Sequence, residues 1–257
     1  MDLGIAGKTA LVTGGSRGLG KHCALSLAGE GVNVAICGRS QDTLDATTAE
    51  LRDLGVEAAG IVADVSDTDQ AGPLHSQVVD RLGPIDILVN NVGGSNVRSD
   101  APELTVDEFK DVLDLNVFGG YALMRLVIPH MREQKWGRII NIASIYGREF
   151  GGNLGYMTAK AALIAATKHV ARTLVTDGVL VNSIAPGSIL HEGGSWERFQ
   201  NESPPDVVAD FIDRNLPLGK FGWPEPVGDL TAFLASERAD LITGACIVVD
   251  GNQSKYV

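Results

Sequence analysis

Short apolar runs alternate with segments of helical periodicity along the whole chain. The runs that we predict as strands cover residues 9–13, 32–37, 58–63, 85–90, 138–143, 180–185 and 246–249. The predicted helices run from the first glycine-rich turn through residue 27 and then over 44–54, 70–82, 109–131, 156–175 and 227–234. Nearly continuous Val, Ile, Leu and Ala runs are typical of strands that are buried on both faces. The pattern therefore predicts an α/β fold with a doubly wound parallel sheet.

One stretch, residues 188–226, breaks this alternation. It is rich in Gly and Pro, holds several aromatic residues, and is long for a connection inside a compact domain. Such connections usually form functional lids, so we expect a substrate lid here. The rest of the chain has no repeat, low-complexity tract or linker, and residues 1–257 are therefore predicted to form a single domain.

Composition and charge limit the classes of function. Of the 257 residues, 44% are hydrophobic and 21% are charged, which is typical of a packed globular protein. The formal net charge of −11 disfavours binding to nucleic acid or to an anionic membrane surface. The three cysteines are scattered, as expected for buried thiols in a reducing compartment, and the five histidines form no metal-ligand cluster. Without a signal-peptide pattern or an apolar run of ~18 residues, we expect a cytoplasmic protein with no transmembrane helix.

The first predicted strand leads directly into a glycine-rich turn and then into a helix. Gly14, Gly18 and Gly20 lie within the sequence Thr-Gly-Gly-Ser-Arg-Gly-Leu-Gly. Glycines at such a turn let the backbone approach a pyrophosphate, and the helix N-terminus supplies free N–H groups. A glycine-rich turn without a ligand is the simpler alternative, but the strand–turn–helix context favours a dinucleotide site.

Tyr156 and Lys160 are four residues apart in a predicted helix, so they share one helix face. A nearby positive charge stabilises a phenolate and lowers the pKa of the phenol. A tyrosine tuned in this way transfers protons near neutral pH. Many helices carry such a pair by chance. A serine directly after a strand, such as Ser144, is also common without any catalytic role. The pair therefore gains weight only from the motifs around it.

Together these motifs resemble the short-chain dehydrogenase/reductase family, and within it the 3-oxoacyl-thioester reductases. The resemblance covers nearly the whole chain and rests on motifs in the family's order: Gly14-x-x-x-Gly18-x-Gly20, Asn90-Asn91-Val92-Gly93, Asn116, Ser144, Tyr156, Lys160 and Pro186-Gly187. It implies a Rossmann fold with a seven-stranded sheet in the order 3-2-1-4-5-6-7 and an NAD or NADP cofactor. It also implies a homotetramer or homodimer that pairs through the two long helices, 109–131 and 156–175.

The resemblance assigns roles to four side chains. Tyr156 would be the acid/base that protonates a carbonyl oxygen, and Lys160 would lower its pKa and bind the nicotinamide ribose. Ser144 would hydrogen-bond to the substrate oxygen as charge develops there. Asn116 would hold a water that connects Lys160 to solvent. Ser144 as a turn residue and Asn116 as a helix-packing amide are the alternatives. The implied reaction interconverts a ketone and a secondary alcohol.

The choice of cofactor depends on the end of the second strand. NAD enzymes usually have an acidic residue there for the ribose 2′-hydroxyl, whereas this chain has Gly38 followed by Arg39. Arg39 and Arg17 suit a 2′-phosphate, so NADP(H) is predicted over NAD(H); solvated surface arginines are the alternative. The resemblance also implies an adenine contact at Asp64 and Val65, where Asp64 could cap the following segment as well. The other implied cofactor positions are Gly14, Ser16, Gly18, Leu19, Gly20, Asn91, Gly93, Tyr156, Lys160, Pro186, Gly187 and Ile189.

One position departs from the family pattern. A threonine that binds the nicotinamide carboxamide commonly stands four residues after the glycine of Pro186-Gly187, and this chain has His191 there. Histidine also donates or accepts hydrogen bonds, but its reach differs. The carboxamide contact is therefore in question, with the backbone at Ile189 as another source, and a loop histidine without a role is the alternative.

The substrate pocket is expected between residues 94–97, 145–154 and 188–215. Gly94, Phe150 and Trp196 would form a partly apolar wall beside Ser144 and Tyr156 for a small carbonyl or alcohol substrate. The aromatic residues could instead pack the lid or a subunit contact. A non-catalytic NADP-binding regulator and a dehydrogenase of a cyclic or steroid-like alcohol remain alternatives.

Two further possibilities are disfavoured. A sugar-nucleotide epimerase or dehydratase would carry a larger C-terminal substrate domain than the short tail after the sixth predicted strand allows. A basic patch for an acidic carrier protein could be built from four residues, but ordinary surface charges are favoured because the net charge would repel such a carrier. The four residues are Arg125, Arg132, Lys135 and Arg138.

Overall fold

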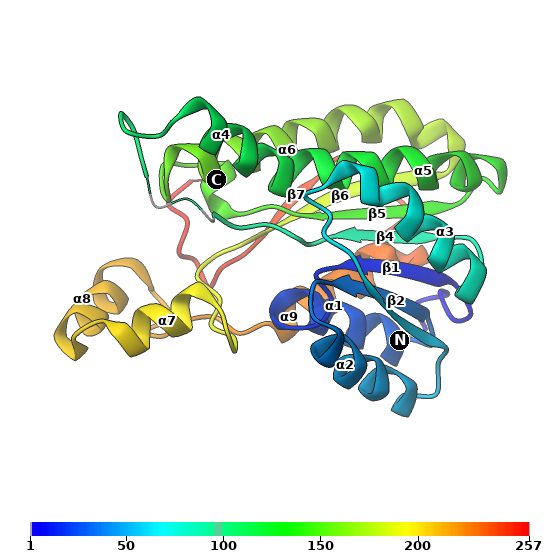
Figure 1. Cartoon of the computed structure of the whole chain (residues 1–257), viewed down its shortest axis with the longest axis horizontal. Coiled ribbons are helices and arrows are strands. Elements are labelled where there is room, and N and C mark those ends of the chain that lie inside the picture. Colours follow the sequence, from blue (N-terminus) through cyan, green and yellow to red (C-terminus); the bar gives the residue numbers. More distant parts are fainter. Residues whose placement is uncertain (1, 96, 98, 257) are drawn as a thin grey trace.

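The computed structural model describes residues 2–95, 97 and 99–256, and one seven-stranded parallel sheet forms its centre (Figure 1). The strands lie in the order β3-β2-β1-β4-β5-β6-β7, which confirms the predicted order. Neighbouring strands pair in parallel register throughout, for example Leu11 with Ala35 and with Leu88. The strands are β1 (Thr9–Thr13), β2 (Asn33–Gly38), β3 (Ala58–Val62), β4 (Ile87–Asn90), β5 (Gly137–Ile142), β6 (Val179–Pro186) and β7 (Cys246–Val249).

Helices cover both faces of the sheet, as the doubly wound prediction requires. Helices α1 (Gly18–Gly29), α2 (Gln41–Asp53) and α9 (Glu225–Ala235) lie on one face (Figure 1). Helices α3 (Ala71–Leu82), α4 (Val106–Leu113), α5 (Gly119–Glu133) and α6 (Leu154–Leu174) lie on the other. Each layer has its own core of fully buried aliphatic side chains, with Leu27 and Val227 in the first and Leu123 and Met124 in the second. Burial on both faces explains why the strands are apolar throughout.

The long helix predicted over residues 109–131 begins three residues earlier and is not uniform. Thr105 and Glu108 form a reciprocal cap, in which Thr105 Oγ1 accepts from the Glu108 N–H (3.2 Å) and the Glu108 carboxylate accepts from the Thr105 N–H (2.8 Å). Between α4 and α5 the segment Asp114–Phe118 is a π-helical turn. Such turns are frequent at functional sites, and this one carries Asn116.

Among the described residues, one helical run, Val106–Glu133, is long enough and apolar enough to cross a membrane. This is a statement about length and composition, and the mean hydropathy over an 18-residue window of the run is 1.3. Passing this test by length and composition is weak evidence for a membrane span, so the expectation of no transmembrane helix stays a prediction. A third of that window (33%) is buried inside the protein, and core helices of soluble proteins pass the same test. Leu123, Val127 and Met131 of this run are completely or almost completely buried against the sheet. Packing on the sheet therefore accounts for the apolar residues of this run that are buried.

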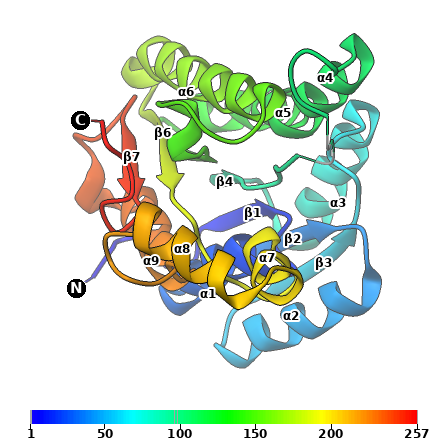
Figure 2. The ribbon, with the colours of Figure 1, turned by 90° about the vertical axis from the view of Figure 1, so that its left-hand side faces the viewer.

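The stretch 188–226, which was expected to be an irregular lid, contains two helices. These are α7 (Ser195–Glu202) and α8 (Pro205–Asn215), which project from the body beside α1 and α9 (Figures 1 and 2). An aromatic cluster joins them, because Trp196 lies 5.8 Å from Phe199 and 4.8 Å from Phe211 between ring centroids. Neither helix has a fully buried residue, and the aromatic cluster connects the pair to the buried Phe221, whose ring centroid lies 5.3 Å from that of Trp196.

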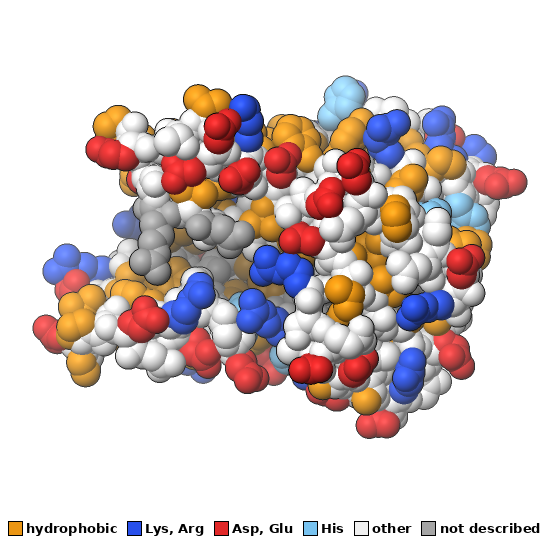
Figure 3. All heavy atoms as spheres, viewed as in Figure 1, with side chains coloured by type: hydrophobic (Ala, Val, Ile, Leu, Met, Phe, Trp, Pro, Cys, Tyr) orange, Lys and Arg blue, Asp and Glu red, His pale blue; other side chains and the backbone are white. Residues whose placement is uncertain are grey.

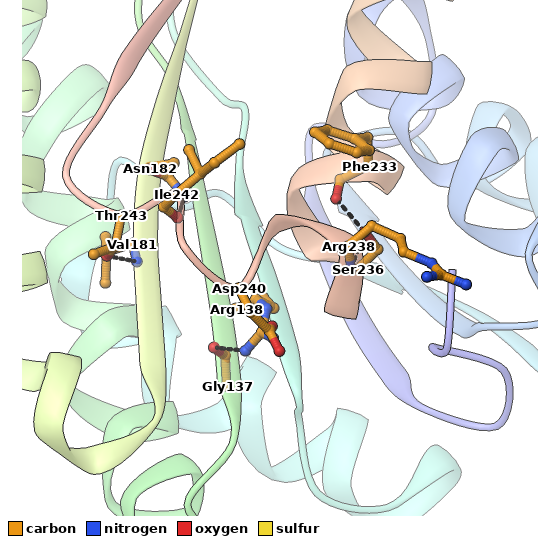
Figure 4. Close-up of polar contacts among 10 residues, drawn as sticks. All are labelled: Gly137, Arg138, Val181, Asn182, Phe233, Ser236, Arg238, Asp240, Ile242 and Thr243. Atoms are coloured by element: carbon orange, nitrogen blue, oxygen red, sulfur yellow. Dashed lines mark hydrogen bonds and ion pairs between the residues drawn. The ribbon is translucent and has the colours of Figure 1, made fainter. Parts of the chain in front are cut away.

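The segment after α9 is tied to strands β5 and β6, as Figure 4 shows. Asn182 Nδ2 donates to the Ile242 carbonyl (2.7 Å), and the Val181 N–H donates to Thr243 Oγ1 (3.2 Å). Arg138, which was grouped with possible surface charges, is instead buried and pairs with Asp240 at 2.5 Å. It lies within strand β5 with its guanidinium against the Trp136 ring, so it cannot belong to an exposed basic patch.

Candidate active site

The carboxyl ends of the strands open into a cleft of about 670 Å³ (Figure 3). A separate hollow of about 460 Å³, bounded in part by Lys8, Asp86 and His130, contains none of the predicted site residues. The cleft brings together most of the predicted site. The predicted residues that line it are Gly14, Ser16, Arg17, Leu19, Arg39, Asp64, Val65, Asn91, Gly93, Gly94, Ser144, Tyr156, Lys160, Pro186, Gly187, Ile189 and Trp196.

Strand β1 passes into α1 through a turn that only glycine fits. Gly14 and Gly18 have φ angles of +62° and +55°, in the left-handed region. A Cβ on Gly20 would lie 2.3 Å from the Gly14 carbonyl oxygen, so the turn closes tightly on itself. Asn91 Nδ2 donates to the Thr13 carbonyl (2.8 Å), which holds the end of β4 against this turn. Gly18 and Gly20 do not line the cleft themselves; they shape the backbone that does.

The end of β2 is open, as the sequence predicts. A Cβ on Gly38 would contact Ser16 Oγ at 3.2 Å, and the neighbouring Arg39 side chain is 71% exposed. Arg39 Nη1 lies 3.9 Å from Asp64 Oδ2 across the cleft rim. Asp64 Oδ1 also accepts from the Ser66 hydroxyl (2.7 Å) and N–H (3.0 Å), so the capping role weighed for Asp64 is present. The Ser66 hydroxyl bond, with a smaller contribution from Arg39, lowers the pKa of the Asp64 carboxyl and keeps it ionised.

Ser144, Tyr156 and Lys160 meet where β5 ends and α6 begins. Ser144 is buried, and its hydroxyl accepts from the Tyr146 N–H (3.2 Å) while lying close enough to the Tyr156 phenol to lower the pKa of that phenol. Asn153 caps α6 by accepting from the Tyr156 N–H at 2.9 Å, which fixes the first turn of the helix. Lys160 is buried one turn further on and donates from Nζ to the Ile142 carbonyl at 2.9 Å. The three side chains thus converge on one wall of the cleft.

Burial dominates the titration of this group. It raises the pKa of the Tyr156 phenol above its ordinary value, and the Ser144 hydrogen bond opposes the shift. Lys160 Nζ lies over the ring, 5.6 Å from its centroid, and donates to the Ile142 carbonyl, so the expected lowering of the Tyr156 pKa by Lys160 stays a prediction. Burial lowers the pKa of the Lys160 ammonium to about 8.

Asn116 stands behind the cleft wall and does not line the cleft itself. Its amide nitrogen donates to the carbonyls of Val112 and Gly94, both at 2.8 Å, and its Oδ1 accepts from the Gly94 N–H at 3.0 Å. A Cβ on Gly93 would lie 2.6 Å from Lys160 Nζ and 2.8 Å from Asn116 Oδ1, so the three groups are in close contact. Asn116 therefore packs as a helix amide, which was the alternative to a role in water binding. The same side chain also fixes the Gly93–Gly94 loop beside Lys160.

One predicted wall position, Phe150, is not brought to the cleft. Phe150 is 90% exposed and does not line the cleft. The sequence could not predict this, because a loop has no helical or strand periodicity that would give the direction of a side chain. Asn96, within the expected wall 94–97, lies outside the described residues. Sequence reasoning also missed Ser40, Thr43 and Arg198, which line the cleft. Arg198 belongs to α7, whose helical character was not predicted, so nothing in the pattern directed its side chain.

The fold and the site together define a class of protein. A family model described as short chain dehydrogenase matches residues 8–200 of the sequence. The chain therefore belongs to the short-chain dehydrogenase family, a family of oxidoreductases, which confirms the resemblance drawn from the motifs.

Individual relatives cover almost the whole chain. It is 37% identical to the 3-oxoacyl-[acyl-carrier-protein] reductase FabG of Staphylococcus epidermidis over 95% of this chain and 98% of that protein. The structure of L-sorbose reductase from Gluconobacter frateurii, complexed with NADPH and L-sorbose, is 30% identical, with a TM-score of 0.90 and full coverage of both chains. A 7α-hydroxysteroid dehydrogenase complexed with NADH and 7-oxo glycochenodeoxycholic acid is 27% identical, with a TM-score of 0.89 over 99% of this chain and 97% of that one.

Proposed function

We propose that this protein is a cytoplasmic NADPH-dependent reductase that converts a ketone, preferably a 3-oxoacyl thioester, into a secondary alcohol. The observation that carries the proposal is the convergence of Ser144, Tyr156 and Lys160 on a cleft that also contains the glycine turn. The 3-oxoacyl-[acyl-carrier-protein] reductases at 36–37% identity support the substrate class. Relatives that act on a sugar or a steroid have the same fold, so the substrate class rests on sequence similarity and is tested below.

The cleft fits an NADP(H) cofactor. The tight turn at Gly14 and Gly18 and the free N–H groups at the start of α1 suit a pyrophosphate. Gly38 leaves room beside the ribose, and Arg39 with Arg17 supplies positive charge for a 2′-phosphate. Asp64 and Val65 line the adenine end, and Gly187 and Ile189 line the nicotinamide end. The NADPH in the L-sorbose reductase structure supports this assignment.

The bound cofactor would supply the hydride that reduces the carbonyl carbon. Ser144 holds the carbonyl oxygen through its hydroxyl, a contact that strengthens as negative charge develops. Tyr156 donates its phenolic proton to that oxygen, and its raised pKa keeps it protonated at neutral pH, as reduction requires. Lys160 supplies positive charge beside the phenolate that remains. Asn116 keeps the Gly93–Gly94 backbone fixed against Lys160, and the helices α7 and α8, with Trp196 at the cleft, act as the substrate lid.

A homotetramer or homodimer is proposed through the two long helices. Their outer surface exposes large apolar side chains, with Phe118 at 46% and Tyr121 at 49% of full exposure. Burying such side chains between subunits is favourable. Light scattering on the purified protein tests this assembly, and a monomer at micromolar concentration would contradict it.

The test of function is a substrate panel with purified protein and NADPH. Acetoacetyl-coenzyme A represents 3-oxoacyl thioesters, a cyclic diketone and a 7-oxosteroid represent the alternatives, and loss of NADPH absorbance is the measurement. We expect the thioester to give the highest kcat/KM, by at least about tenfold. A higher value for the diketone or the steroid would replace the substrate class but keep the reaction. NADPH binding without turnover of any ketone would favour the non-catalytic regulator instead.

A further inference from the structure

His191 is the cleft residue whose role the family resemblance leaves open. It lines the cleft four residues after Gly187, and its ring packs against the glycine turn. A Cβ on Gly18 would lie 2.7 Å from both Cε1 and Nδ1 of the imidazole. Because Gly18 is the first residue of α1, the ring lies at the helix N-terminus, where free N–H groups favour an anion.

The two ring nitrogens of His191 have different surroundings. Nδ1 lies 3.0 Å from the Glu192 carbonyl oxygen, which only accepts hydrogen bonds, so Nδ1 carries the proton of the neutral ring. No other described residue hydrogen-bonds to Nε2 (residues 2–95, 97 and 99–256). In the neutral ring Nε2 therefore has a lone pair, which repels a phosphate oxygen. Protonation turns Nε2 into a cationic donor.

The charged groups around the ring come from three segments. Arg17 belongs to the glycine turn, and its Nη1 would lie 2.9 Å from a Cβ on Gly193. Glu192 is exposed on the same loop as the histidine. From α7, the Glu197 carboxylate accepts from the Gly193 N–H at 2.7 Å, and Arg198 lines the cleft. The Glu197 carboxylate is thus engaged by a backbone donor, and the two arginines balance the charges of the two glutamates, so the charge of the His191 ring decides the sign of this corner of the cleft.

We propose that His191 binds the cofactor pyrophosphate through Nε2 at the N-terminus of α1, and that cofactor affinity consequently falls as pH rises. The inference rests on the proposed function, because it takes a nicotinamide dinucleotide as the ligand. A protonated imidazole adds a charge-assisted hydrogen bond to the phosphate oxygens, and the neutral ring removes it. The threonine common at this place in the family has no charge to lose, so the pH dependence would be particular to chains with histidine here.

The test measures the dissociation constant of the cofactor by fluorescence titration near pH 6 and pH 8. NADH is titrated beside NADPH because the 2′-phosphate of NADPH changes its own charge near pH ~6. For NADH we expect the wild-type Kd to rise about five- to tenfold from pH 6 to pH 8, as loss of one charge-assisted hydrogen bond predicts. In His191→Gln the change should stay within about twofold, and His191→Lys should bind equally well at both pH values because lysine keeps its charge.

Two controls make the outcome decisive. His169→Gln removes an exposed histidine of α6, outside the cleft, and should follow the wild type. If NADH binds too weakly, NADPH is used instead. The ratio of its Kd at pH 8 to its Kd at pH 6 is measured for the wild type and for His191→Gln, and the wild-type ratio divided by the variant ratio should again be about five to ten. If glutamine disturbs the loop, His191→Asn makes the same comparison. Equal pH dependence in the wild type and the folded variant would overturn the role of His191 while leaving the proposed function intact. Failure of the wild type to bind either nucleotide at pH 6 would refute the proposed function itself.

Discussion

Burial acts in opposite senses on the two titratable side chains of the proposed proton path. It raises the pKa of the Tyr156 phenol and lowers the pKa of the Lys160 ammonium to about 8. Both shifts favour the neutral form, because a charge is poorly solvated behind the cleft wall. The phenol is therefore protonated at neutral pH, as the proposed proton donor must be, and the Lys160 ammonium loses its charge above about pH 8.

Tyr156→Phe removes the proton donor and keeps the ring. We expect turnover to fall by about 10²–10⁴-fold, the usual contribution of a positioned acid, while the Kd for NADPH changes by less than about threefold. The measurement is steady-state kcat beside a fluorescence titration of NADPH. Tyr256→Phe, at an exposed tyrosine outside the cleft, is the matched control and should behave as wild type. Wild-type turnover in the Tyr156 variant would refute its role.

Lys160→Met tests the cost of the buried ammonium. The folded protein penalises the charged lysine, whose pKa falls from 10.5 to about 8, so the penalty is complete below pH 8 and disappears between pH 8 and 10.5. We expect the variant to be inactive but more stable than wild type by about 1–3 kcal/mol at pH 7, after loss of the hydrogen bond to Ile142. This gain should shrink as pH rises toward 10.5.

Urea unfolding of both proteins at pH 7 and pH 10 measures this difference. Lys168→Met, which removes an exposed lysine from the same helix, should show no comparable dependence on pH. A stability difference between the Lys160 variant and the wild type that is identical at both pH values would show that burial of the charge is not its cause.

Among the structural elements, the end of β2 offers the sharpest test of cofactor choice. A Cβ on Gly38 would lie 3.2 Å from Ser16 Oγ and 3.7 Å from Leu44 Cδ2, so it fits once the Ser16 side chain shifts by a few tenths of an ångström. In Gly38→Asp the carboxylate would repel a 2′-phosphate and accept a hydrogen bond from a 2′-hydroxyl. We expect the ratio of kcat/KM for NADPH over NADH, at least about tenfold in the wild type, to fall below one.

Gly72→Asp is the matched control for this change of cofactor preference. It adds the same charge on α3, where a Cβ would meet nothing within 4 Å, and should leave the ratio unchanged. An unchanged ratio in Gly38→Asp would place the 2′-phosphate elsewhere than at the end of β2.

The same elements show what the sequence could predict. The strands were predicted to within about two residues because runs buried on both faces leave an unambiguous apolar pattern. Helices α7 and α8 were missed because they are short, flanked by Gly and Pro, and have no fully buried face that would produce a periodic signal. The cap at Thr105 and Glu108 is visible in the sequence and would have given the correct start of α4.

The site divides in the same way. Motif residues such as Ser144 and Tyr156 were predictable because backbone position alone brings them to the carboxyl ends of the strands. The direction of Lys160 Nζ toward the Ile142 carbonyl, and of Phe150 into solvent, depends on side-chain rotamers and loop shape that no periodicity encodes. The expected effect of Lys160 on the Tyr156 pKa depends on that direction and therefore stays a prediction.

For the whole molecule, the net charge and the cleft make opposite predictions about an anionic cofactor. The protein has a formal net charge of −11 and should repel NADPH at long range. The cleft itself is lined by four basic side chains, Arg17, Arg39, Lys160 and Arg198, and by the carboxylate of Asp64, and Figure 3 shows Lys and Arg side chains beside the hollow. Coulomb interactions are screened over about 10 Å at 0.1 M salt, so the arginines in the cleft outweigh the distant carboxylates once the ligand is bound.

The Kd for NADPH should therefore rise with salt, by about three- to tenfold between roughly 0.05 and 0.5 M sodium chloride. Arg39→Gln should weaken binding at low salt and flatten this dependence, because it removes a cation at the proposed 2′-phosphate site. Arg214→Gln, on α8 and paired with Asp210, should keep the wild-type slope. Fluorescence titrations across the salt series give all three slopes. A Kd that falls with added salt would mean that the overall acidity governs binding, and the cleft arginines would then not be the phosphate ligands.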